Sequence, residues 1–169
     1  MANFKAAFTN TMLNEGGYKL TNIPGDRGGM TYAGISRKMW PNWGGWVYID
    51  ADTTPPNDLV EAFYKQAFWD PLMLDHVSAS VVSSNIYDFA VNAGGKTAAK
   101  LAQVAARTTP DGVMGQKTLT AINTMSTEMF ILRFSLAKIA RYRDIVAKDR
   151  SQIKFLMGWL NRTLDEAKI

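Results

Sequence analysis

The chain has 169 residues, of which 47% are apolar and 20% are charged, with a formal net charge of +4 and no cysteine. These values indicate one globular domain, or a catalytic domain with a small appended subdomain, and exclude a disordered or low-complexity chain. The lack of cysteine excludes disulfides, thiolate nucleophiles and thiolate zinc sites. The mild positive charge favours contact with a polyanion, but the basic residues are scattered and predict no nucleic-acid site.

The N-terminal third begins with a predicted helix and continues into a predicted β element. Phe4, Phe8 and Met12 recur every four residues, which predicts a helix with one apolar face that ends at Gly16-Gly17. Residues 18–31 are rich in Gly, Pro, Asn, Asp and Thr and predict a short hairpin or structured loop. Residues 35–40 predict one or two helical turns, and residues 41–56 predict a long irregular connection.

The rest of the chain is predicted to be almost wholly helical. The apolar spacing predicts helices over residues 57–68, 80–92, 96–106, 116–125, 127–148 and 152–166. Breaks are predicted at Trp69-Asp70-Pro71, Gly94-Gly95 and Pro110-Asp111-Gly112. No repeat or linker divides the sequence. The predicted fold class is therefore mainly α (α+β), a helical bundle with a small N-terminal β-hairpin element, forming a single unit over residues 1–169.

The residue inventory excludes most hydrolytic mechanisms. His76 is the only histidine, whereas metal-dependent hydrolysis takes several ligands at fixed spacing, so no metal is expected. A Ser-His-Asp triad would have to use His76, which has no serine elbow nearby. No Gly-rich phosphate loop is present, and no cofactor is expected. Fifteen acidic residues remain, and cleavage of a glycosidic bond needs only two carboxyl groups, one protonated and one ionised.

Glu15 has the predicted surroundings that best suit a general acid. It lies seven residues after Phe8 and eleven after Phe4, on the apolar side of the first helix. It also lies in the last turn, where the helix dipole disfavours a negative charge. Partial burial and the dipole both raise a carboxyl pKa, and a raised pKa lets a general acid keep its proton near neutral pH. The alternative is a glutamate that faces solvent at a helix end.

Asp26 is the second candidate carboxylate. Gly25, Gly28 and Gly29 surround it, and glycines let the backbone turn sharply and approach a ligand closely. A loop that follows the helix of the acid can bring Asp26 opposite Glu15, with Thr31 near enough to share a water molecule. The alternative is an ordinary turn aspartate.

Short motifs in a fixed order resemble those of a known family. They comprise Glu15-Gly16-Gly17-Tyr18, residues 25–29 with Thr31, residues 69–71, 87–94 and 111–122, and Gly158-Trp159-Leu160-Asn161-Arg162. Each motif is weak alone, but the ordered set spans nearly the whole chain. It resembles the family of phage muramidases and typhoid-toxin secretion lysozymes, glycoside hydrolase family 108.

The resemblance implies a lysozyme-like fold with a catalytic part over about residues 1–92 and a helical part over about 93–169 that resembles a peptidoglycan-binding region. It implies Glu15 as the catalytic acid. Asp26 and Thr31 fall where related phage lysozymes hold the attacking water, a layout that implies inversion. The sequence departs from the family at Arg27, where such loops often have proline, and at Tyr32, an aromatic one place earlier than usual.

Further substrate contacts are expected from aromatic residues, because their rings pack on the apolar faces of sugars. Tyr32 is one candidate. Trp43 is another, since at least one of Trp40, Trp43 and Trp46 is expected to line the glycan groove. The alternative is that the tryptophans cover the core.

The helix that carries the family motif at residues 87–94 offers two more candidates, Tyr87 and Asn92. Asn92 can hydrogen-bond an N-acetyl group or cap the helix before Gly94. Asp88 on the same helix is expected either to contact the substrate or to pair with Arg162 or a backbone amide.

The predicted function is that of an endolysin-type N-acetylmuramidase, which hydrolyses the β-1,4 bond between N-acetylmuramic acid and N-acetylglucosamine during host lysis by a phage. The expected partners are bacterial peptidoglycan and a holin for release, with no nucleic acid, no stable membrane insertion and a monomeric state. Residues 1–14 show no signal peptide, so synthesis in the host cytoplasm and action in the periplasm or on the wall are expected. The open alternatives are a secretion-associated lysozyme, a lytic transglycosylase and a non-catalytic wall-binding protein.

Overall fold

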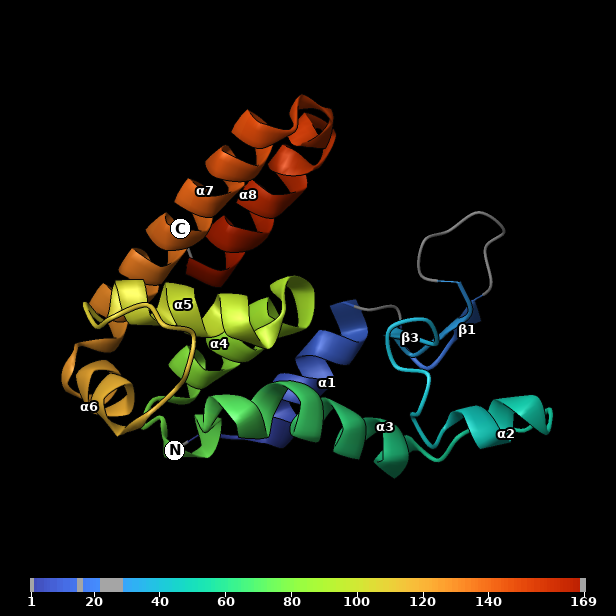
Figure 1. Ribbon diagram of the computed structural model, residues 1–169. Helices are drawn as coiled ribbons and strands as arrows, with labels where there is room; N and C mark the ends of the chain where they lie inside the picture. Colours follow the sequence, from blue (N-terminus) through green and yellow to red (C-terminus); the bar gives the residue numbers. More distant parts are fainter. Residues whose placement is uncertain (1, 15–16, 22–28, 168–169) are drawn as a thin grey trace. The chain divides into compact units, whose positions relative to one another are not determined.

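The computed structural model describes residues 2–14, 17–21 and 29–167, and Figure 1 shows its elements. Contacts divide the chain into two compact units, Phe4–Asp70 and Pro71–Ile169, the latter joined by Met1–Asn3; we call them the N-terminal and C-terminal units. The described residues are mainly helical, with one small antiparallel sheet in the N-terminal unit. The predicted fold class is therefore confirmed.

The first helix, α1 (Phe4–Asn14), buries the apolar face that the sequence predicts. Phe8 and Met12 are both buried, and the Phe8 ring lies 5.6 Å from that of Tyr64, the last residue of α3 (Asn57–Tyr64). Gly17 has φ 78°, and its N–H donates to the Met12 carbonyl at 2.9 Å. This left-handed glycine ends α1 because it satisfies a carbonyl of the last turn.

The sheet consists of β1 (Leu20–Thr21), β2 (Thr31–Tyr32) and β3 (Ile35–Ser36) in that order, all antiparallel. Ala33 and Gly34 join β2 to β3 and both have positive φ, as a two-residue primed hairpin turn requires. The Tyr64 hydroxyl donates to the Ala33 carbonyl at 2.9 Å and so ties this turn to α3. The prediction of helical turns over residues 35–40 is therefore only partly right: residues 35 and 36 form a strand, and one turn follows, in which the Trp40 N–H donates to the Ser36 carbonyl at 2.9 Å.

The connection over residues 41–56 contains a helix that the sequence did not predict, α2 (Trp46–Asp50). Tertiary contacts hold this helix at both ends. The Trp46 ring is buried and its Nε1–H donates to the Trp40 carbonyl at 2.7 Å, while Asp50 receives two hydrogen bonds from Arg37, at 2.6 and 2.7 Å. Local composition carries no sign of these distant partners.

After α3, the helix continues as a π-helical turn, η1 (Lys65–Trp69), so that the predicted helix over 57–68 is confirmed but is not α-helical throughout. The Trp69 side chain at its end is fully buried and lies 5.3 Å from the ring of Phe4. The N-terminal unit therefore has an aromatic core of its own between α1 and α3.

All the regular elements in the described residues of the C-terminal unit are helices. The turn η2 (Asp70–Leu72) begins at the last residue of the N-terminal unit. It is followed by η3 (Leu74–His76), α4 (Ser80–Ala93), α5 (Gly95–Ala105), α6 (Gln116–Thr124), α7 (Thr127–Lys148), η4 (Arg150–Gln152) and α8 (Ile153–Ala167). The bounds of α4 to α8 agree with the predicted helices within one residue. In Figure 1, α4 and α5 pack together, and α7 pairs with α8.

The corner between α4 and α5 consists of a single residue, Gly94, with φ 87° and ψ 144°. Side chains disfavour this region of backbone space, which is essentially restricted to glycine. The corner lets α5 fold back against α4 and place Ala98, Ala99 and Ala102 in the core, all with no exposed surface. The break predicted at Gly94-Gly95 thus occurs at Gly94 alone, and Gly95 is already the first residue of α5.

Candidate active site

The two predicted catalytic carboxylates, Glu15 and Asp26, lie outside the described residues. What the structure does describe is the backbone beside them. Helix α1 ends at Asn14, the described backbone continues from Gly17 into β1, and Thr21 at the end of β1 pairs with Thr31 of β2. The roles predicted for Glu15 and Asp26 stay predictions.

Thr31, the predicted water-positioning residue, lies half-buried on the central strand β2. Its hydroxyl donates to the Gly29 carbonyl at 3.3 Å, and its own carbonyl accepts from the Thr21 hydroxyl at 3.4 Å. In the sheet, Thr31 pairs with Thr21 on one side and with Ser36 on the other. A hydroxyl that donates one bond retains its lone pairs to accept another, as the orientation of a water molecule requires.

Tyr32, next on the same strand, lies against Trp43; the substrate contacts predicted for both residues stay predictions. Their rings stack at 6.0 Å with an interplanar angle of 20°. Tyr32 is only 3% exposed, and its hydroxyl has no hydrogen-bond partner within the described residues. Burial raises the pKa of this hydroxyl. The Tyr32 ring therefore supports Trp43 from behind and presents little surface of its own.

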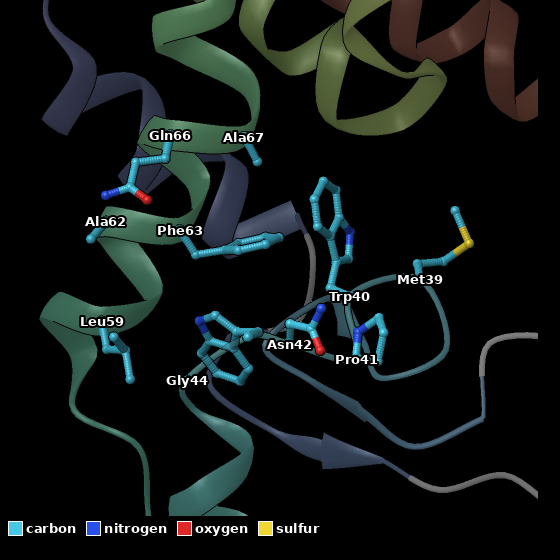
Figure 2. Close-up of a pocket in the computed structure, with 11 residues that line it drawn as sticks. Met39, Trp40, Pro41, Asn42, Gly44, Leu59, Ala62, Phe63, Gln66 and Ala67 are labelled. Atoms are coloured by element: carbon cyan, nitrogen blue, oxygen red, sulfur yellow. The ribbon is translucent and has the colours of Figure 1, made fainter.

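Trp43 lines a groove of about 510 Å³ in the N-terminal unit. One wall comes from the loop after β3 and the other from α3 and η1, as Figure 2 shows for Trp40, Asn42, Phe63 and Gln66. The eleven lining residues are Met39, Trp40, Pro41, Asn42, Trp43, Gly44, Leu59, Ala62, Phe63, Gln66 and Ala67. None of them is ionisable, so this groove offers contact surface and amides but no proton-transfer group.

The three tryptophans of this region take different places. Trp40 is 40% exposed and meets the Phe63 ring edge-on at 5.0 Å, and Trp43 is 9% exposed; both line the groove. Trp46 is 3% exposed and lies in the core against Trp43, at 5.1 Å. An uncharged groove walled by aromatic rings and amide side chains is the arrangement expected of a carbohydrate-binding protein.

Tyr87 and Asn92, the other two predicted contacts, belong to α4 of the C-terminal unit. The Tyr87 side chain is fully buried. Asn92 is exposed, and both ends of its amide are bonded: Nδ2 donates to the Asp88 carbonyl at 2.7 Å and Oδ1 accepts from Arg162 at 2.7 Å. In this arrangement Asn92 joins α4 to α8.

Arg162 forms the ion pair that was predicted as one of two alternatives for Asp88. Its Nε and Nη2 donate to the two carboxylate oxygens at 3.0 and 3.1 Å, a bidentate geometry. A further pair lies beside it, because Lys138, with no exposed surface, donates to Glu166. Burial, with the nearby Asp88, raises the pKa of Glu166 above its usual value despite Lys138.

Sequence reasoning did not identify Lys138, although the signal was present. It lies four residues after Phe134 and eight after Phe130, on the apolar face of α7. Its ammonium lies over the Phe134 ring, 4.8 Å from the centroid. A lysine at an apolar position predicts a buried acidic partner, and here the partner is Glu166.

Two absences concern the described residues alone. Within residues 2–14, 17–21 and 29–167, no three metal-ligating side chains gather into a group that would hold an ion. In the same ranges, every helix is too short or too polar to cross a bilayer.

Comparison with known proteins places the chain in a family. A family model described as Glycosyl hydrolase 108 matches residues 8–94, more than half of the chain, and one described as Predicted Peptidoglycan domain matches residues 97–164. Among solved structures, Brucella abortus SagA is similar over 98% of this chain and 91% of that one, with 26% sequence identity and a TM-score of 0.76. A search of curated proteins finds no match.

The chain therefore belongs to glycosyl hydrolase family 108. It is a glycosidase that carries a peptidoglycan-binding domain, and it hydrolyses peptidoglycan. The two family models meet between residues 94 and 97, at the Gly94 corner, whereas the contacts divide the chain at Asp70 and Pro71. Helix α4 thus carries the end of the hydrolase match and packs with the C-terminal unit.

Proposed function

We propose that this protein is an N-acetylmuramidase, which hydrolyses the β-1,4 bond between N-acetylmuramic acid and N-acetylglucosamine. The observation that carries the proposal is the hydrolase match over residues 8–94, followed directly by the peptidoglycan domain. In this mechanism Glu15 protonates the leaving glycosidic oxygen, while Asp26 and the Thr31 hydroxyl direct water onto the opposite face of the sugar.

The aromatic groove supports a glycan substrate. An N-acetylated sugar offers apolar ring faces, hydroxyls and an uncharged amide, and the groove offers the rings of Trp40, Trp43 and Phe63 with the amides of Asn42 and Gln66. We assign this groove to binding of a saccharide, and bond cleavage to the residues between α1 and β2.

Mass spectrometry of the fragments from purified peptidoglycan tests the reaction. The unmodified protein is expected to release fragments with reducing N-acetylmuramic acid ends. Glu15→Gln removes the transferable proton, and release is expected to fall by about 10²–10⁴. Anhydro-muramic ends would assign the protein to the lytic transglycosylases. If a folded sample releases no fragments, the remaining alternative is a non-catalytic wall-binding protein.

The role of Thr31 is tested with a matched pair of variants. Thr31→Val keeps the shape and strand propensity of the side chain but removes the hydroxyl, so kcat is expected to fall at least about tenfold through misplacement of the water. Thr21→Val makes the same change at the paired position on β1, and kcat is expected to stay near that of the unmodified protein. Equal losses in the two variants would indicate a structural effect on the sheet.

The stereochemical course distinguishes the proposed water from a covalent intermediate. Inversion requires room for water between two carboxyl groups about 6.5–9.5 Å apart, whereas retention requires about 5 Å. Proton NMR of the first-formed product is expected to show the α-anomer. An initial β-anomer would mean retention, and Asp26 would then be a nucleophile.

We propose lysis of a bacterial host by a phage as the biological setting, with release to the wall through a holin. The support is the resemblance of the ordered motifs to phage muramidases. Expression in a bacterium is expected to leave the culture intact until the inner membrane is permeabilised by chloroform or a co-expressed holin, when turbidity should fall rapidly. Lysis without any permeabilisation would contradict the holin step.

A further inference from the structure

The positive charge of the chain is concentrated in the C-terminal unit. Residues 71–169 contain 13 Lys and Arg against 8 Asp and Glu, a net charge of +5, whereas residues 4–70 contain 6 against 7, a net charge of −1. The whole positive excess thus belongs to the part of the chain that includes the peptidoglycan-domain match. Such a charge favours an anionic partner.

Part of this charge lines a groove of about 580 Å³ along α5 and α7. Lys96 and Lys100 of α5 and Arg141 and Lys148 of α7 are its cationic lining residues. The lysines are exposed, and within the described residues no carboxylate pairs with Lys96, Lys100 or Lys148. The one acidic lining residue, Asp144, already accepts two hydrogen bonds from Arg143, at 2.9 and 2.7 Å.

Between the cations the groove is apolar. Besides Thr97, the other uncharged lining residues are aliphatic, and we call them the apolar floor: Leu101, Val104, Ala137, Ala140 and Ile145. Val104 is 46% exposed, so the floor is open to solvent. The groove therefore fits a ligand that carries several negative charges on a chain with small apolar groups, rather than a densely charged polyanion.

A tight turn lies against the side chains of Lys96 and Lys100. Gly112 has φ 86°, and a Cβ there would come within 2.9 Å of Lys96 Cγ and 3.3 Å of an atom of Lys100. The buried Gln103 fastens this turn, because it donates to Asp111 Oδ1 at 2.7 Å and accepts from the Gly112 N–H at 2.8 Å. The Asp111 carboxylate attracts Lys100 without pairing with it, and both lysines are exposed, so their ammonium groups stay available.

We propose that this groove binds the peptide stems of peptidoglycan, with their free carboxylates on Lys96, Lys100, Arg141 and Lys148 and their alanine methyl groups on the apolar floor. The inference rests on the proposed function, since it takes the wall as substrate. The spacing agrees: cations four and seven residues apart on a helix are separated by about 6 and 10 Å. Carboxylates two or three residues apart on an extended peptide span about 7–10 Å.

The test compares two triple variants of the full chain that remove the same charge. Lys96→Gln, Lys100→Gln and Lys148→Gln together neutralise the groove. Three other exposed cations of the same unit outside the groove serve as the control, with glutamine at Lys117, Arg150 and Lys154. Each is measured for retention on sacculi free of accessory polymers, and on the same sacculi after an amidase has stripped the peptide stems from the glycan.

The groove variant is expected to bind intact sacculi about tenfold more weakly than the unmodified protein, the combined effect of three exposed ion pairs. The control variant is expected to bind as the unmodified protein does. On stripped glycan, all three proteins should bind equally. Equal binding of the two variants to intact sacculi would overturn the proposal, as would a groove defect that persists on stripped glycan, because the anionic partner would then not be the stem.

Fragment release, measured in parallel, separates this inference from the proposed function. If the protein releases no fragments but its retention depends on the stems, the muramidase proposal is contradicted and the proposed role of the groove holds. If all three proteins release reducing ends equally well and their retention does not depend on the stems, the muramidase proposal holds and the proposed role of the groove is contradicted. Matching circular dichroism spectra and melting temperatures of the two variants show that both are folded.

Discussion

Trp43 lies directly against the backbone of its neighbour Gly45, where an added Cβ would overlap the indole ring. The ring also packs between Tyr32 and Trp46, so it has little freedom to withdraw. Gly45→Ala is therefore expected to displace the Trp43 ring and to lower the free energy of unfolding by about 1–3 kcal/mol. Urea denaturation measures the loss, and tryptophan fluorescence reports the displaced ring.

The adjacent glycine provides the control for this substitution. A Cβ at Gly44 would meet no atom within 4 Å. Gly44→Ala is therefore expected to leave the stability within about 0.5 kcal/mol of the unmodified protein. Equal losses at Gly44 and Gly45 would show that the region is sensitive to any side chain, and that Trp43 is not specifically held by Gly45.

The buried pair of Lys138 and Glu166 gives a pH-dependent prediction at the same scale. The folded-state pKa of Glu166 lies above its ordinary value, chiefly because of burial and also because of Asp88. A carboxyl of this kind favours the folded state most when protonated, and this stability declines as the pH rises through the folded-state pKa. The positive charge of Lys138 offsets the free-energy cost of burying the ionised Glu166 carboxylate.

Lys138→Met removes that offset and leaves Glu166 with Arg162, whose Nε lies 3.8 Å from the carboxylate. The expected loss at pH 7 is about 3 kcal/mol. It should shrink as the pH falls toward the ordinary carboxyl pKa, because a protonated Glu166 needs no partner. Urea denaturation of both proteins at pH 7 and pH 4.5 measures this. A loss that is the same at both pH values would mean that the lysine contributes packing alone.

At the scale of elements, the corner between α4 and α5 depends on Gly94. With φ 87° and ψ 144°, its backbone is costly for any other residue, and Gly94→Ala is expected to destabilise the fold by about 1–3 kcal/mol. Gly95, the first residue of α5, has no positive φ and no atom within 4 Å of a Cβ. Gly95→Ala is expected to be neutral or stabilising by up to about 1 kcal/mol. Thermal unfolding of both variants measures the two changes in stability. Losses of stability of similar size in the two variants would contradict the backbone strain assigned to Gly94.

The same scale explains which elements the sequence predicts. Helix α7 has an apolar period over six turns, and its predicted bounds agree with the structure. Strand β3 has two residues, too few to show an alternation, and it exists because the Ala33-Gly34 turn returns the chain and Tyr64 holds that turn. Helix α2 likewise depends on Arg37, thirteen residues before its partner Asp50. Short elements fixed by tertiary bonds leave no periodic signal.

The candidate site was predictable to a similar extent. Residue chemistry selected Tyr32 and Trp43, which the structure brings together. It gave Arg162 as one alternative partner of Asp88, and the two residues do pair, across 74 residues of sequence. The second wall of the aromatic groove was not predicted. Phe63 and Gln66 come from a helix whose apolar spacing predicts ordinary core packing. No sequence pattern shows which part of such a helix faces solvent and not the core.

For the whole molecule, the two compact units differ in charge, in core and in size. The N-terminal unit has a net charge of −1 and carries the uncharged aromatic groove, whereas the C-terminal unit has a net charge of +5 and the cationic groove. In the two proposals above, a neutral glycan and its charged peptide stems bind to surfaces of different chemistry. Attachment to the wall should accordingly depend on salt more strongly than contact with the glycan does.

The two units are also expected to unfold separately, because each has its own core. The N-terminal unit, with 67 residues against 102, buries a smaller fraction of its surface and should unfold at the lower urea concentration. Trp40, Trp43, Trp46 and Trp69 belong to it, and Trp159 alone belongs to the other unit. Fluorescence of a Trp159→Phe variant therefore reports the N-terminal unit, while circular dichroism at 222 nm reports mainly the C-terminal helices.

The expected result is a fluorescence transition at lower urea than the dichroism transition. Gly45→Ala should shift only the fluorescence transition and Gly94→Ala only the dichroism transition, because each substitution strains one core. Coincident transitions that both variants shift together would instead describe a single cooperative unit, with the division at Asp70 and Pro71 carrying no independent stability.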